Sequence, residues 1–151
     1  MRRAVAVFVL LAVLPSTGCN KNTTQTASQA ASNVTAMANN PVVTSLSAAT
    51  GIPASQAMGG VGALLGLAQT NLASADWSKV AAVVPEASNL ISEAKTMGGI
   101  SKFTNLADLS GAFTKMGLTG DQVKTLSGAL TDTVSKAAGP EVGTALAAAI
   151  K

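Results

Sequence analysis

The apolar residues after about residue 41 recur three or four positions apart, which is the spacing of one face of an α-helix. The clearest run is Val123, Leu126, Leu130 and Val134, whereas the alternation typical of strands is rare. Proline, glycine and small polar residues divide this stretch into segments. We expect helices over about 41–50, 53–71, 74–84, 85–98, 106–116, 119–138 and 140–150. The pattern therefore predicts an all-α domain of six or seven short helices built from helical hairpins.

Residues at the predicted helix starts support these boundaries. Asn40 followed by Pro41 is typical of an N-cap with proline at the first helical position. Ser74 is expected to cap the third helix. Thr119 and Gln122 have the spacing of a capping box, in which each side chain binds the other residue's backbone N–H.

The N-terminus has the features of an export signal. A short positive segment, Met1-Arg2-Arg3, precedes eleven apolar residues from Ala4 to Leu14. A membrane-spanning helix needs about 20 such residues, so this run fits the apolar part of a signal peptide. We therefore assign residues 1–18 to a signal peptide.

Small residues and a lone cysteine follow the apolar run. Ser16, Thr17, Gly18 and Cys19 resemble a bacterial lipobox, in which the cysteine is acylated and becomes the new N-terminus, although leucine usually stands where this chain has Ser16. The alternative is ordinary secretory cleavage at the same small residues, which would leave a free thiol. We expect a lipidated Cys19, and Asn20 after it resembles the outer-membrane signal of lipoproteins.

Residues 19–40 read as a lipidated cysteine and a flexible tether. The segment is rich in Thr, Asn, Gln, Ser and Ala, with Val34 and Met37 as its large apolar residues. Such a segment buries too little surface to offset the entropy lost on ordering. The sequence thus divides into a leader at 1–18, a disordered tether at 19–40 and an all-α domain at 41–151.

Composition excludes several classes of function. The chain has 48% hydrophobic and only 11% charged residues, with no His, no Tyr and one Cys. It therefore has no Ser-His-Asp triad, no Cys-His pair, no His-ligated metal site and no disulfide framework. The lysines are scattered, and Trp77, Phe103 and Phe113 are the only aromatic residues after the leader, so we expect no nucleic-acid binding. We expect no enzyme activity, cofactor or metal.

Three glycines form the most unusual feature of the predicted domain. Gly59, Gly62 and Gly66 fall on one side of a predicted helix, although each glycine costs about 0.5–1 kcal/mol relative to alanine in a helix. Such a stripe lets another backbone come close. It predicts either a helix-packing face within the chain or a face for self-association.

Other candidate sites have plainer explanations. Ser92 and Lys95 match the S-x-x-K motif of penicillin-recognising enzymes, but no S-D-N or K-T-G accompanies them. Trp77 is either a ligand platform or a core anchor, and its shared face with two valines favours the core. The carboxylates are spread one per helix or turn, which argues against a calcium loop. Four of them are expected in first helical turns, where they complement the helix dipole: Asp76, Glu86, Asp121 and Glu141.

Four stretches carry a resemblance to a known family. They are residues 50–52 (TGI), 56–67 (QAMGGVGALLGL), 72–84 and 112–118 (AFTKMGL). Over about residues 45–150 the chain resembles the VcgC/VcgE domain of unknown function, a family of small bacterial proteins that often carry export signals. The resemblance implies an all-α fold and an exported location, and it implies no activity, cofactor or catalytic residue.

Together these features predict a non-enzymatic bacterial envelope lipoprotein, anchored at the periplasmic face of the outer membrane. Its helical domain is expected to bind a protein partner or to self-associate. The alternative is a binder of a lipid or another apolar small molecule between the helices, because small side chains leave room for a cavity there.

Overall fold

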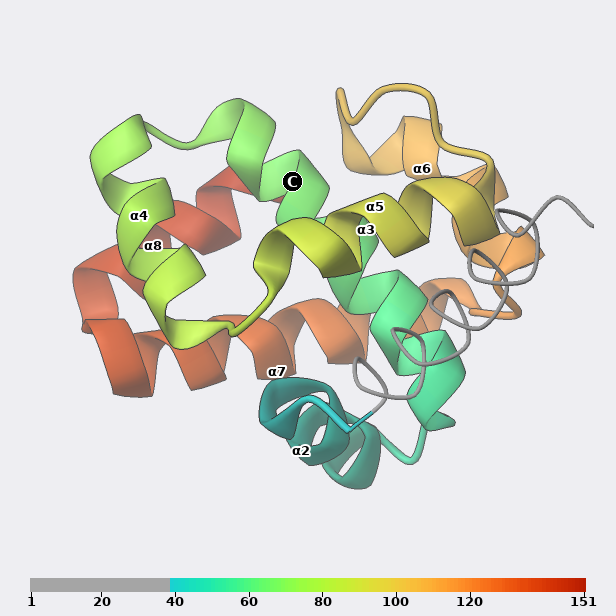
Figure 1. The fold of residues 1–151 in the computed structure, drawn as a ribbon, viewed down its shortest axis with the longest axis horizontal. Helices are drawn as coiled ribbons and strands as arrows, with labels where there is room; N and C mark the ends of the chain where they lie inside the picture. Colours follow the sequence, from blue (N-terminus) through green and yellow to red (C-terminus); the bar gives the residue numbers. More distant parts are fainter. Residues whose placement is uncertain (1–38) are drawn as a thin grey trace, which may run out of the picture.

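The structure, a computed structural model, describes residues 39–151, and this part of the chain is built entirely from helices and their connections (Figure 1). The predicted all-α fold is confirmed. The leader, Cys19 and the tether up to residue 38 lie outside the described residues. The helices are α2 (Pro41–Thr50), α3 (Ala54–Asn71), α4 (Ser74–Val83), α5 (Ala87–Gly98), α6 (Leu106–Lys115), α7 (Gly120–Ala138) and α8 (Pro140–Ala149).

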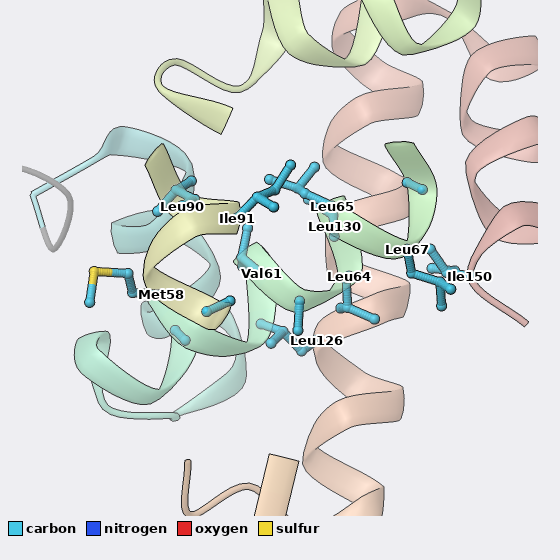
Figure 2. Close-up of a cluster of buried hydrophobic side chains, with 14 of the residues drawn as sticks. Met58, Val61, Leu64, Leu65, Leu67, Leu90, Ile91, Leu126, Leu130 and Ile150 are labelled. Carbon is cyan, nitrogen blue, oxygen red and sulfur yellow. The ribbon is translucent and has the colours of Figure 1, made fainter. Parts of the chain in front are cut away.

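Helix α3 forms the centre of the domain and contacts all six other described helices. Its residues from Ala57 to Ala68 are all buried, as expected for a helix that is apolar all round. Figure 2 shows its side chains interleaved with those of α5, α7 and the end of α8. The core of the domain is therefore arranged around α3.

The most extensive contacts of α3 are with α5, and not with its neighbour in the chain, α4. Helices α7 and α8 do form an antiparallel pair of consecutive helices, joined at Gly139 with a φ of 100°. A hairpin of the expected kind thus exists at the C-terminal end, whereas the packing of α3 joins helices that are distant in sequence.

Two of the three predicted caps are confirmed. The Asn40 side chain accepts the N–H of Val42 at 3.0 Å and donates to the carbonyl of Pro85 at 2.6 Å. Asn40 is only 5% exposed. Its two hydrogen bonds connect the start of α2 to the turn after α4. The capping box of Thr119 and Gln122 is present at the start of α7.

The predicted starts of α4 and α5 need correction. Ser74 is the first residue of α4 and not its cap, because the extended residue before the helix is Ala73, which has no side-chain acceptor. Helix α5 begins at Ala87 and not at Pro85. Glu86 has a φ of 58°, a left-handed conformation. The chain therefore turns at Pro85 and Glu86 before α5 can begin.

Candidate functional site

The glycine stripe lies inside the domain. Gly59, Gly62 and Gly66 are all buried in α3. A Cβ placed on Gly62 would collide with the backbone carbonyl oxygen of Leu90 in α5 and lie 2.9 Å from the Cβ of Ala94. The absence of a side chain at Gly62 thus lets α3 and α5 approach each other.

Side chains of the same chain cover the other two glycines. A Cβ on Gly59 would lie 2.5 Å from the Met116 sulfur, and one on Gly66 would lie 2.6 Å from the Phe103 ring. In this structure the stripe is a packing surface within the chain and is closed to a second molecule.

Sequence reasoning missed further close approaches of this kind, and two of them lie against α7. A Cβ on Gly60 would lie 2.5 Å from Leu126, on the side of α3 that faces α7. A Cβ on Gly143 in α8 would collide with the side chain of Ser135 in α7. Gly60 adjoins Gly59 in the sequence, but it does not share the three-and-four spacing that defined the stripe, and Gly143 stands alone in its helix.

The residues of the S-x-x-K match do not form a catalytic pair. Ser92 is exposed, and its hydroxyl donates to the backbone carbonyl of Ser88 at 3.0 Å. The ammonium of Lys95 lies 5.4 Å above the centre of the Phe103 ring. Trp77 is half-buried and packs against the hydrophobic core, which is the contact expected of a core anchor.

Two carboxylates form ion pairs within their own helices. Asp76 pairs with Lys79 at 3.3 Å, and the ion pair of Asp121 with Lys124 spans 4.0 Å. Asp76, Asp121 and Glu141 lie in first helical turns as predicted, whereas Glu86 stands just before α5. Among residues 39–151, no group of three acidic or cysteine side chains is placed to hold a metal ion, and every buried side-chain N or O atom has a hydrogen-bond partner.

An open apolar groove runs between α6 and α7. We call it the α6–α7 groove. It has a volume of about 250 Å³. Its lining residues are Leu106, Ser110, Phe113, Thr114, Leu118, Gly120, Val123 and Lys124. A second hollow of about 290 Å³ continues along α7 to the end of α8 and shares Leu106 and Lys124 with the first.

Leu106 is the first residue of α6 and is half-buried, with part of its side chain packed against the hydrophobic core. It stands where the two hollows meet. Together the two hollows therefore form a continuous apolar surface along α7, and surfaces of this kind are common at interaction sites.

The described residues carry no net side-chain charge, because seven lysines balance seven carboxylates. Within them, no helix is both long enough and apolar enough to cross a membrane. The groove thus lies on a domain with a weakly charged surface.

Comparison with known proteins identifies a family. The family model described as "Protein of unknown function VcgC/VcgE (DUF2780)" matches residues 9–150. This match covers most of the chain, so the chain belongs to that family, and the resemblance seen in the sequence is confirmed. Neither the curated proteins nor the solved structures yield a significant match.

Proposed function

We propose that this member of the VcgC/VcgE family is a non-enzymatic envelope lipoprotein, and that its domain binds a protein partner or a second copy of itself through the α6–α7 groove. The observation that carries the proposal is the groove itself, with the half-buried Leu106 between two connected hollows. A continuous apolar surface of this kind is typical of a surface that is covered in a complex.

The shape of the groove favours a protein over a small molecule. Pockets for small ligands usually measure about 300–1,000 Å³ and enclose most of the ligand. The α6–α7 groove and the hollow beside it, about 250 and 290 Å³, are open to solvent along α7 and do not enclose a ligand. An elongated apolar groove suits the apolar face of a helix. The alternative, a lipid or another apolar small molecule, would occupy the same groove.

The charge balance favours self-association in particular. A domain whose net charge is close to zero has little electrostatic repulsion between copies. Seven lysines and seven carboxylates in the described residues give that balance. A second copy is therefore a reasonable first candidate for the partner.

Two features of the sequence support the remaining parts of the proposal. The lack of histidine, together with carboxylates that are held in local pairs and helix starts, supports a non-enzymatic role. The leader and Cys19 support export and lipid anchoring, with the periplasmic face of the outer membrane as the proposed site.

Leu106→Asp tests the groove, and Ala107→Asp is the control for the added charge. Thermal melts check the fold, because Leu106 also packs against the hydrophobic core. Both changes add one carboxylate to the first turn of α6, but Ala107 is exposed and does not line the groove. We expect Leu106→Asp to weaken association measured by sedimentation velocity by about 30-fold or more, the effect of losing a central contact of about 2 kcal/mol. Ala107→Asp should leave association unchanged.

The same pair of variants distinguishes the alternatives. If the wild-type protein is monomeric, chemical crosslinking in the native envelope should give a heterologous product that Leu106→Asp loses and Ala107→Asp keeps. A monomeric protein that forms no such product, but retains a lipid that Leu106→Asp releases, would favour the small-molecule alternative. Equal behaviour of both variants in every assay would reject the groove as the site.

A further inference from the structure

Three lysines gather around the connection between α5 and α6. We call Lys95, Lys102 and Lys115 the lysine patch. Lys95 lies over the ring of Phe103, and Phe103 follows Lys102 directly in the sequence. Lys102 and Lys115 line the same hollow of about 440 Å³. Figure 1 shows this connection arching along the edge of the molecule, outside the helical core.

The patch has few negative neighbours. Neither ion pair of residues 39–151 involves it, since those pairs join Lys79 with Asp76 and Lys124 with Asp121. The one carboxylate in the lining of the hollow is Asp108. Its oxygen accepts hydrogen bonds from the hydroxyl of Thr104 and from the amide of Asn105.

Charge is therefore distributed unevenly over a domain that is neutral as a whole. Three lysines, Asp108 and Glu93, which lies two residues before Lys95 in α5, give a local charge of +1 around the α5–α6 connection. The remaining four lysines and five carboxylates of the described residues give −1. Such a distribution orients the domain toward a negatively charged surface with the patch facing it.

The hollow beside the patch is also open to a negatively charged group. Small residues line much of it, including Gly98, Gly99 and Gly111. Ser101, Lys102 and Thr104 are exposed, so their polar groups remain accessible. The ammonium groups of Lys102 and Lys115 can therefore approach a negatively charged group at this hollow.

We propose that the lysine patch docks the domain onto the anionic phospholipid headgroups of a membrane surface. This contact is separate from the protein contact proposed for the α6–α7 groove, and it does not depend on that proposal. Each lysine held near an anionic membrane contributes about fivefold in affinity, which corresponds to about 1 kcal/mol. Salt weakens the contact because the lysines are exposed.

Lysine footprinting on the full-length protein tests this proposal. The protein is mixed with vesicles of phosphatidylcholine, with or without phosphatidylglycerol, and acetylation of each lysine by a water-soluble reagent is followed by mass spectrometry. Arg2 and Arg3 of the leader also favour anionic lipid, but they bring all lysines of the domain to the vesicle alike. Lysines outside the patch therefore serve as the internal reference. We expect acetylation of the lysine patch to slow severalfold only on the anionic vesicles, and high salt to reverse the effect. Lys79 and Lys136 should react equally on both.

A matched pair of triple variants gives a second measurement. Replacing the lysine patch with glutamine should reduce the preference for anionic over neutral vesicles by about fivefold per lysine. The same replacement at Lys79, Lys136 and Lys151, none of which lines the α6–α7 groove, removes the same total charge and should reduce it much less. Thermal melts check the fold, because Lys95 and Lys115 also lie in the last turns of α5 and α6, where they complement the helix dipoles.

Three outcomes would overturn the proposal. The first is equal protection of all lysines on anionic vesicles, and the second is equal protection of the patch on neutral ones. The third is protection of the patch by inorganic phosphate as strong as that by vesicles, which would indicate a site for a soluble anion instead of a membrane contact.

Discussion

A single missing side chain determines how closely the two most extensively packed helices approach. Gly62 faces the carbonyl oxygen of Leu90, a backbone atom that cannot rotate away as a side chain can. The three-and-four spacing of Gly59, Gly62 and Gly66 predicted a flat helix face from the sequence. It could not predict what covers that face, because α5 and Phe103 reach it only through contacts distant in sequence.

We predict that Gly62→Ala destabilises the domain by about 1–3 kcal/mol, because even one methyl group forces α3 and α5 apart. Gly128→Ala is the matched control. It lies within α7, and a Cβ there would meet nothing within 4 Å. That change should stabilise the domain by about 0.5–1 kcal/mol, since alanine is the better helix former. Thermal unfolding followed by circular dichroism, at two protein concentrations, measures both. A Gly62→Ala protein that melts at or above the wild-type temperature would contradict the close packing.

Helix ends are the elements that the sequence predicts best, except where the backbone turns unexpectedly. Asn40 and Thr119 cap α2 and α7 because each has a side-chain oxygen at the residue that precedes the first turn. Ser74 has the right side chain, but it stands one position too late. The start of α5 was predicted wrongly because a positive φ at Glu86, a residue that rarely adopts it, has no signal in the local sequence.

Ser74 and Thr119 allow a test of helix capping. Thr119→Ala removes the hydroxyl that accepts the Gln122 N–H at 3.3 Å, and it should destabilise the domain by about 1 kcal/mol. Ser74→Ala should change stability by less than about 0.5 kcal/mol, because the Ser74 side chain does not cap α4. Urea unfolding of both variants measures the two effects. Equal losses would mean that Ser74 contributes as a cap after all.

At the scale of the whole molecule, periodicity predicted the fold class but not the arrangement of the helices. The reason lies in α3, which is apolar all round and therefore does not indicate which neighbour it prefers. The α6–α7 groove was missed for a related reason. Leu106 has the spacing of a core residue, and its partial exposure depends on how α6, α7 and the end of α8 meet. Local sequence does not encode where three helices leave a gap.

The location of the whole protein rests on Cys19, which lies outside the described residues. We predict that the wild-type protein incorporates a fatty-acid label in cells and that Cys19→Ser abolishes this label, because acylation requires the thiol. Mass spectrometry of the N-terminal peptide should show an acylated Cys19 in the wild type and a retained leader in the variant. Ser16→Leu is the control, because it supplies the leucine usual at this place in lipoproteins and should be labelled at least as well.

The rival to lipidation makes a different prediction for the same peptide. Secretory cleavage after Gly18 would leave an unlabelled protein that begins with a free thiol at Cys19, and Cys19→Ser would then be cleaved like the wild type. A free thiol in an oxidising compartment would form disulfide-linked dimers, which non-reducing electrophoresis detects. Unlabelled wild-type protein with such dimers would remove the proposed anchor. The domain would then reach a membrane only through its own surface, and the vesicle experiments on the lysine patch would measure its whole membrane affinity.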